Sequence, residues 1–237
     1  MSANAGAPNV QVANSGVATN VVQGIDTLTA AMKSNIIPDQ EYLLQGSIMD
    51  SQVDVLKHRL RGLCDNVDSG HETFQEREMV FVIQGTTSQP LNLRIRRPLD
   101  PSLSADIPWQ LRYIGQPELG NRATIVRSCY DIACSENAVE FLTELGCRLD
   151  YEFVAKGFLF RKGRMKVTLS KIFKVQSAMP PGSGAENHDP LTNSHLVELS
   201  VLAPSGADAV ADDMKNFADQ LKPLVMLDKI NPGRAGF

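Results

Sequence analysis

The chain has 237 residues, of which 43% are hydrophobic and 21% are charged, and its formal net charge is −4. This length suits one large β domain or two small domains, and the slight acidic excess argues against a general nucleic-acid-binding protein. No segment approaches the eighteen or more apolar residues of a membrane-spanning helix, so we expect no membrane contact.

Residues 1–40 consist mostly of Ala, Asn, Val, Gly and Gln and carry almost no charge. Such a segment buries too little apolar surface to offset the entropy that ordering it would cost, so we expect a disordered tail. Within it, only residues 25–32 suit a short helix. The folded part is expected to begin with a strand at 41–48.

A helix is predicted to follow this strand, with Asp50 or Ser51 as its N-cap. Its apolar residues recur at the spacing of a buried helix face: Val53, Leu56, Leu60 and Leu63. His58 falls on the basic side of this helix, and we interpret it as a surface histidine rather than a general base.

Four strands are expected next, at 78–84, 91–97, 109–113 and 124–133, after a polar loop at 66–75. The first is an unbroken apolar run, which is typical of a strand covered on both faces. The second and third alternate between apolar residues and arginine or amide residues, the period of two that a half-buried strand shows.

A second helix is predicted between Ser135, its expected N-cap, and Gly146, which tolerates the left-handed conformation of a helix end. Its expected core-facing residues are Ala138, Phe141, Leu142 and Leu145.

The segment 152–175 is predicted to form a long β-hairpin that turns at 161–164, because Gly163 tolerates a left-handed conformation. Its second strand places these residues on one face: Met165, Val167, Leu169, Phe173 and Val175. The opposite face carries Lys166, Thr168, Ser170 and Lys174. An isolated hairpin is marginally stable in water, so this one is expected to pair with other strands.

A flexible excursion is predicted at 176–194, and the last strand at 195–202. The final helix should begin near Ser205 and Asp208, which have the spacing of a capping box, and end at Pro223. Its expected buried residues are Val210, Met214, Phe217, Ala218 and Leu221.

About eight strands with few helices predict a mainly β (α+β) fold, an antiparallel β-barrel with flanking helices. We expect a single barrel domain at 41–230 with a flexible insertion at 176–194. The segments 1–40 and 231–237 are expected to be tails.

The charges on the polar strand faces are the strongest enzyme-like feature: Arg94, Arg96, Arg112, Arg127, Glu152, Lys156 and Glu198. If these faces lie inside a closed sheet, they form a charged tunnel that could hold a polyphosphate with metal ions. That chemistry needs several converging carboxylates. The sequence offers Glu76 and Glu78, at the expected entrance of a strand, and Glu198, so we interpret the charges as the solvated outer face of the sheet.

No other catalytic or cofactor-binding pattern is present. The cysteines Cys64, Cys129, Cys134 and Cys147 form no close pair, and we expect buried, inert thiols and no zinc site. Phosphate-binding loops and nucleophile-elbow motifs are absent. We therefore predict no catalytic, cofactor-binding or metal-binding residues and no cofactor.

The basic hairpin also carries Phe158, Phe160 and Phe173 among its cations, a combination that can stack nucleic-acid bases. We interpret these rings as core residues and expect no sequence-specific nucleic-acid binding. The cations at 161–164 remain a candidate contact for an acidic protein segment.

Several segments together resemble the animal form of subunit 18 of the Mediator of RNA polymerase II transcription. They run in order from Glu41 to Ile230: EYLLQGSIMD (41–50), HRLRGLCDN (58–66), PWQLRYIGQPELG (108–120), EFVAKGFLFRKGRMKV (152–167), LVELSVLAPSG (196–206) and DDMKNFADQLKPLVMLDKI (212–230).

This resemblance implies a nuclear, non-enzymatic scaffold subunit of the Mediator head module. The implied partners are Mediator subunit 20, a helix near the C-terminus of subunit 8, and RNA polymerase II through the head module. The family's barrel resembles that of tunnel-type RNA triphosphatases, but this chain lacks their two strand-borne Glu-x-Glu sets. A metal-dependent polyphosphate or RNA 5′-triphosphate hydrolase is the alternative. We also hypothesise that the hairpin and the strands at 91–97 and 109–114 line the barrel, leaving an outer groove for a partner helix.

Overall fold

The computed structural model describes residues 39–65, 71–84, 90–99, 107–175, 189–207 and 209–230. All of them belong to the unit Asp39–Phe237. The expected helix at 25–32, the C-terminal tail at 231–237, residues 1–38 of the expected N-terminal tail and residues 176–188 of the expected insertion lie outside the described residues.

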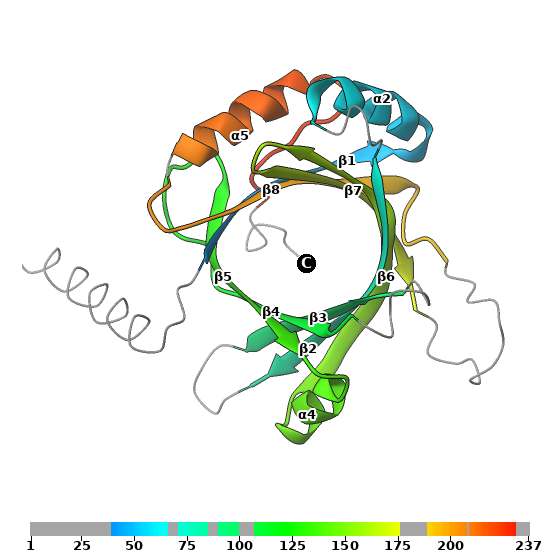
Figure 1. Cartoon of the computed structure of the whole chain (residues 1–237), viewed down its shortest axis with the longest axis vertical. Helices are drawn as coiled ribbons and strands as arrows, with labels where there is room; N and C mark the ends of the chain where they lie inside the picture. Colours follow the sequence, from blue (N-terminus) through cyan, green and yellow to red (C-terminus); the bar gives the residue numbers. More distant parts are fainter. Residues whose placement is uncertain are drawn as a thin grey trace, which may run out of the picture. The chain divides into compact units, whose positions relative to one another are not determined.

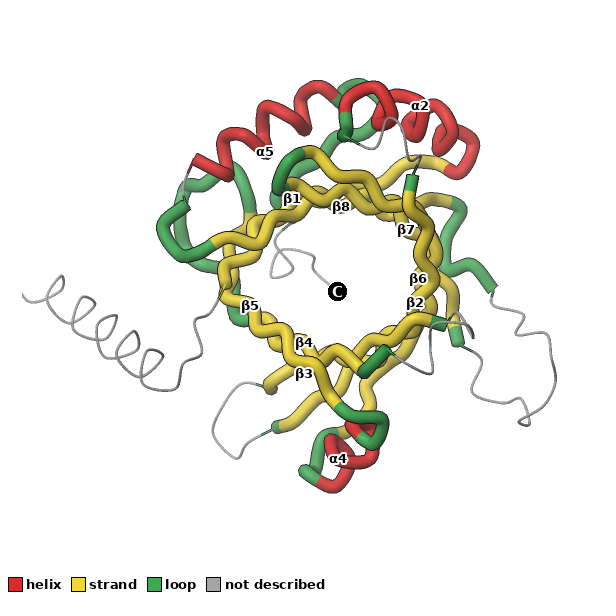
Figure 2. The backbone as a smooth tube through the Cα atoms, viewed as in Figure 1, coloured by secondary structure: helices red, strands yellow, loops and turns green. Residues whose placement is uncertain are grey.

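Eight strands form the fold: β1 (Asp39–Met49), β2 (Glu72–Ile83), β3 (Leu91–Pro98), β4 (Trp109–Ile114), β5 (Ile125–Cys134), β6 (Arg148–Lys162), β7 (Met165–Lys174) and β8 (Ser194–Ala203). They close into a barrel in the order β1-β5-β4-β3-β2-β6-β7-β8, and every neighbouring pair is antiparallel (Figures 1 and 2). Closure leaves no unpaired edge. The predicted antiparallel barrel is confirmed.

The helices lie outside the barrel: η1 (Asp50–Gln52), α2 (Val53–Leu63), α4 (Ala138–Glu144) and α5 (Ala209–Gln220). Helices α2 and α5 cover the wall formed by β1, β7 and β8, whereas α4 lies on the opposite side of the barrel (Figure 1). In the described part of the chain, no helix combines the length and apolar character needed to cross a membrane.

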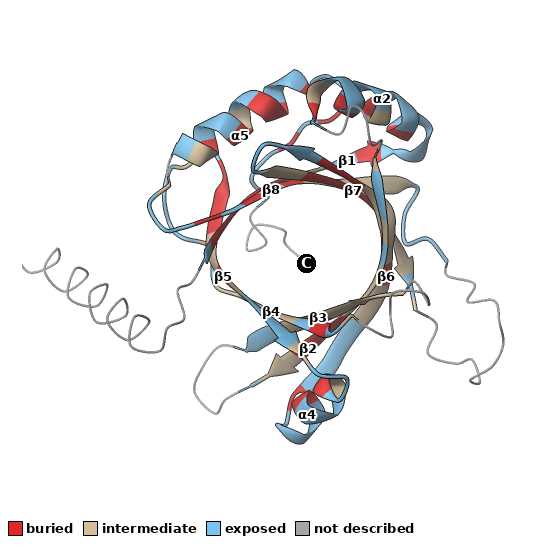
Figure 3. Cartoon of the chain, viewed as in Figure 1, coloured by how far each residue is buried: buried red, intermediate tan, exposed pale blue. Residues whose placement is uncertain are grey.

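The larger core lies between the barrel wall and helices α2 and α5, where buried residues face one another (Figure 3). Its fully buried members include Leu56 and Leu60 of α2, Phe160 of β6 and Leu199 of β8. Each such side chain contributes about 1.5–3 kcal/mol relative to an exposed position. A smaller core packs α4 against β2, β3 and β4. The apolar faces of these strands therefore point outward, toward the helices.

The long hairpin forms as predicted, with β6 and β7 paired from Phe153–Lys174 to Lys162–Met165. Gly163 has φ +54° at its turn, and Gly146 has φ +94° after α4. Asp65, after α2, accepts a hydrogen bond from the Gly163 amide and pairs with Lys162, so the hairpin tip is held against that helix. Phe160 is fully buried and Phe158 packs against the same core, partly covered.

The starts of β1 and β2 and the extent of the expected excursion differ from the sequence expectation. Strand β1 begins at Asp39 rather than at residue 41, because Gln40 pairs with both β5 and β8. Strand β2 begins at Glu72 rather than at residue 78, because the polar segment 72–77 pairs along β6. After Asp189, the expected excursion is already tied to the barrel by the Phe173–Pro190 bridge.

The helix caps also differ. Helix α2 is preceded by a turn of 3-10 helix with no side-chain cap, because Asp50 instead contacts Lys171 and His195. Ser135 donates to Asn137 rather than to the backbone of α4. In α4 only Ala138 and Leu142 of the expected stripe are buried.

Replacing Gly62 with alanine is expected to raise the free energy of unfolding by about 0.5–1 kcal/mol. Gly62 lies in the last turn of α2, where an added Cβ would meet no atom within 4 Å and where alanine is the better helix former. Urea unfolding measures the change. Gly163→Ala is the control: its Cβ also has open space, but the positive φ should make this variant less stable. Equal effects of the two changes would contradict the argument.

Candidate functional site: the charged barrel interior

The interior of the barrel holds a cavity of about 820 Å³. Strands β3, β4 and β5 turn arginines into it, and β1, β2 and β8 turn glutamates and amides into it, because successive residues of a strand face opposite sides of the wall. The charged lining residues from these strands are Glu41, Glu72, Glu76, Glu78, Arg94, Arg96, Arg112, Arg127 and Glu198. The interpretation of the arginine-bearing faces as the outer surface is therefore wrong, and the hypothesis that they line the barrel is confirmed.

Glu41 of β1 is the centre of the ion-pair network on one wall. It accepts a hydrogen bond from Arg127 Nε at 2.8 Å and one from Arg112 Nη1 at 3.3 Å. Arg112 in turn donates from Nε and Nη2 to both oxygens of Asp131, at 2.7 and 2.6 Å. Burial alone would raise the pKa of Asp131, but these two bonds hold it below its ordinary value.

A second set of ion pairs joins β2 to β3. Arg94 Nη1 lies 3.0 Å from Glu78, and Arg96 Nη1 lies 4.0 Å from Glu76. Both glutamates sit in the middle of β2 rather than at a strand entrance, since the strand already begins at Glu72. Their carboxylates are thus engaged by arginines of the neighbouring strand.

The strands β7 and β8 give the cavity a different lining. Glu198 accepts a hydrogen bond from Gln45 Nε2 at 2.8 Å, and burial raises the pKa of its carboxyl. Lys166 also lines the cavity, and burial, followed by the charges of Arg96 and Arg112, lowers the pKa of its ammonium group.

Glu152 of β6 also lines the cavity, and it pairs with Arg77 at 2.6 Å. Lys156 is not part of the lining, and its Nζ lies 5.3 Å from the centre of the Phe173 ring. His58 is exposed on α2, as expected. Cys129 is buried, and burial raises the pKa of its thiol to about 11, which suits an inert residue.

Sequence reasoning missed Glu41, Lys166 and Asp131 as members of one cluster. Glu41 and its arginine partners are separated by 71 and 86 residues, so no local spacing reveals the contact. The one available signal is alternation, which puts each charge on the polar face of its strand.

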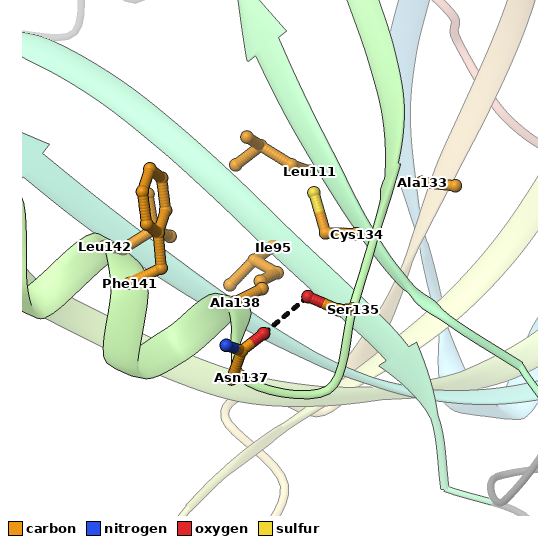
Figure 4. Close-up of a pocket in the computed structure, with 9 residues that line it drawn as sticks. All are labelled: Ile95, Leu111, Ala133, Cys134, Ser135, Asn137, Ala138, Phe141 and Leu142. Carbon is orange, nitrogen blue, oxygen red and sulfur yellow. Dashed lines mark hydrogen bonds between the residues drawn. The ribbon is translucent and has the colours of Figure 1, made fainter.

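A second cavity, of about 380 Å³, lies on the outside of the barrel beneath α4 (Figure 4). Its lining is mainly apolar and includes Ile95, Leu111 and Leu142. Phe141 borders it and is 59% exposed. Among the described residues, no group of three or more His, Cys, Asp or Glu side chains is arranged to hold a metal ion.

Comparison with known proteins identifies the family. The family model described as Med18 protein matches residues 40–105 and 96–232. The chain belongs to the Mediator subunit 18 family. Mediator of RNA polymerase II transcription subunit 18 of Aedes aegypti is 56% identical over 211 residues, which cover 87% of this chain and 92% of that protein. The Drosophila melanogaster subunit is 49% identical, covering 89% and 95%.

A solved structure has the same fold. A chain in the structure of the Schizosaccharomyces pombe Mediator head module aligns with a TM-score of 0.63 at 15% identity, covering 81% of this chain and 98% of that one. Together with the family match, this makes the chain a structural subunit of the Mediator complex in RNA polymerase II transcription. The charged interior described above is thus a feature of a Mediator subunit 18 barrel.

Proposed function

We propose that this chain is a non-enzymatic scaffold of the Mediator head module that acts in the nucleus through protein contacts. The proposal that the chain is not an enzyme is supported by the ion pairs of Glu41, Glu76 and Glu78. Their carboxylate oxygens lie 2.8–4.0 Å from arginine nitrogens. Metal-assisted phosphate hydrolysis needs carboxylates that converge on a cation, whereas these carboxylates neutralise the wall itself.

The proposed partners are Mediator subunit 20, the helix near the C-terminus of subunit 8, and RNA polymerase II through the assembled head module. The outer pocket beneath α4 supports a helix-binding role, because it is a mainly apolar groove between a helix and strands. Phe141 supplies an exposed aromatic anchor at its rim, and Glu140 and Glu144 on α4 favour a partner helix with basic flanks.

We also propose the domain organisation: one barrel domain at 41–230, with an insertion at about 176–194 and a tail at each end. The pairing of β1 from Asp39 supports a domain that begins close to residue 41.

Co-expression with the candidate head-module subunits, followed by size-exclusion chromatography, tests the scaffold role. The chain should elute with subunits 8 and 20 as one stable complex. Phe141→Ser should weaken this complex, since it removes an exposed aromatic anchor without opening a core. Val55→Ser, at a position 50% exposed on α2, is the matched control and should leave the complex intact. A chain that elutes alone in every combination would refute the proposal.

Phosphate release separates the scaffold from the hydrolase alternative. The purified chain should release no phosphate above background from tripolyphosphate or 5′-triphosphate RNA with Mg²⁺ or Mn²⁺. Release that disappears when Glu76, Glu78 and Glu198 are changed to glutamine would establish the hydrolase instead.

A further inference from the structure

Helix α2 lies outside the barrel (Figure 1), and its C-terminal end meets the turn of the β6–β7 hairpin. Asp65, which follows the helix, joins the two elements. It accepts a hydrogen bond from the Gly163 amide at 2.5 Å, and its own amide donates to the carbonyl oxygen of Arg161 at 2.8 Å. The hairpin turn is thereby held beside the end of the helix. We name residues 54–65 and 161–164, with Glu72, the α2–hairpin surface.

This surface carries more cations than carboxylates. Its cations are Lys57, Arg59, Arg61, Arg161, Lys162 and Arg164, and its carboxylates are Asp54, Asp65 and Glu72. Each carboxylate pairs with one cation, and the three ion pairs are Asp54–Lys57 at 3.2 Å, Glu72–Arg161 at 3.3 Å and Asp65–Lys162 at 3.4 Å. Among the described residues, the other three cations form no ion pair with a carboxylate. The surface is therefore locally positive in a chain whose net charge is −4.

Two of these three arginines have guanidinium groups that are available to a partner. Arg59 donates from Nη1 to the carbonyl oxygen of Lys222 at 2.9 Å. Arg61 and Arg164 are exposed, and within the described ranges neither side chain forms a hydrogen bond or an ion pair. A guanidinium group presents its donors in a planar fork that matches both oxygens of a carboxylate. Each of these two arginines can therefore bind one carboxylate through two parallel hydrogen bonds.

We propose that the α2–hairpin surface binds an acidic segment of another protein, with Arg61 and Arg164 as its main contacts. Clusters of arginine recognise acidic motifs in this way. Helix α2 has 11 residues and is about 16 Å long, which an extended segment of about five residues spans. The surface goes beyond the scaffold role proposed above, because α2 and the pocket beneath α4 lie on opposite sides of the barrel (Figure 1).

The covered aromatic rings favour an acidic protein segment over a single-stranded nucleic acid. Proteins that bind single strands stack the bases on aromatic side chains. Phe160 is fully buried, and Lys57 Nζ lies over the Phe158 ring at 4.1 Å from its centre. The carboxylates between the cations, of which Asp54 is 93% exposed, also repel a continuous row of phosphates. The spaced carboxylates of a peptide can pair with the arginines and avoid these positions.

Fluorescence anisotropy of a labelled glutamate peptide of about ten residues, titrated with the full chain at low ionic strength, tests the proposal. The double variant Arg61→Gln, Arg164→Gln should weaken binding about tenfold, within the range that two exposed ion pairs supply. Arg148→Gln is the matched control, since Arg148 is an exposed arginine at the opposite end of β6, and it should bind like the unmodified chain. Equal binding by the double variant and the control would overturn the proposal.

A single-stranded RNA of the same length, used in the same titration, distinguishes the two kinds of partner. The RNA should bind more weakly than the glutamate peptide. RNA binding that is tighter than peptide binding and is lost in the double variant would make the surface a nucleic-acid site instead, contrary to the proposal.

Co-expression of the double variant with the head-module subunits separates this surface from the scaffold contacts. The double variant should still elute with subunits 8 and 20, and Phe141→Ser should bind the glutamate peptide like the unmodified chain. A double variant that no longer elutes with these subunits would assign the surface to them and refute its role in binding a further acidic segment.

An NMR titration of the unmodified chain locates the peptide without any variant. The glutamate peptide should shift the amide signals of Arg61, Asp65 and Gly163 and leave those of α4 unchanged. Shifts on α4, or on α5 without any on α2, would place the peptide elsewhere and contradict the proposal.

Discussion

Replacing Glu41 with alanine is expected to lower the free energy of unfolding by about 3–5 kcal/mol, because it removes a buried carboxylate that two half-buried arginines share. The Glu41 side chain is 7% exposed, and it bonds Arg127 at 2.8 Å and Arg112 at 3.3 Å. Arg112 keeps Asp131, but Arg127 loses its carboxylate and faces a like charge. Urea unfolding near pH 7 measures the loss.

Glu140→Ala is the control for this prediction. Glu140 is an exposed glutamate on α4, so its removal should change stability by no more than about 0.5 kcal/mol. The double variant Glu41→Ala, Arg127→Ala should lose less stability than the sum of the two single variants, because it removes the unpaired charge together with its partner. A loss from Glu41→Ala no larger than that of the control would show that water in the cavity solvates both arginines.

The antiparallel barrel follows from the sequence, but the direction of its two faces does not. In β7 the residues Val167 and Leu169 alternate with Lys166 and Thr168, and this period is the same whichever face points inward. The direction is set by α2 and α5, which cover the apolar face from outside and leave the polar face for the interior. The orientation of the two faces therefore depends on contacts between residues that are far apart in the chain.

The helix α4 shows the limit of helical spacing as a guide to burial. Phe141 and Leu145 have the spacing of a core stripe, yet both are more than half exposed. The helix spans only Ala138–Glu144 and contacts the barrel through Ala138 and Leu142, so it covers a small area of the wall. Spacing identifies an apolar side of a helix, while the neighbouring strands decide how much of it is buried.

The polar start of β2 shows tertiary pairing that overrides local composition. The sequence predicts a loop at 66–75 and no strand before residue 78, because the segment 72–77 is rich in Glu, Gln and Arg. In the barrel it pairs residue by residue with β6, from Glu72–Leu159 to Arg77–Val154. These polar residues form a strand because the long partner strand supplies their backbone hydrogen bonds.

Replacing Gly157 with alanine is expected to destabilise the barrel by more than about 3 kcal/mol or to prevent folding, an effect at the extreme of single substitutions. Gly157 lies in β6 opposite Ser170 of β7. A Cβ at this position would lie 1.9 Å from the carbonyl oxygen of Leu169 and 2.9 Å from its carbonyl carbon. Those are backbone atoms of the adjacent strand, so no side-chain rotation can relieve the contact. Urea unfolding measures the loss, and expression of soluble protein reports the case of no folding.

The neighbouring pairs make this contact costly. Strand β6 is hydrogen-bonded to β2 on its other side, and β7 is hydrogen-bonded to β8. Because the barrel is closed, β6 and β7 cannot separate locally unless these neighbouring pairs also shift. Gly62→Ala is the matched control, since the same added methyl group enters open space in α2 and should stabilise the chain. If the free energy of unfolding of Gly157→Ala is within about 1 kcal/mol of that of the unmodified chain, the prediction is wrong. The two strands would then be able to separate at this point, which an intact β6–β7 ladder does not allow.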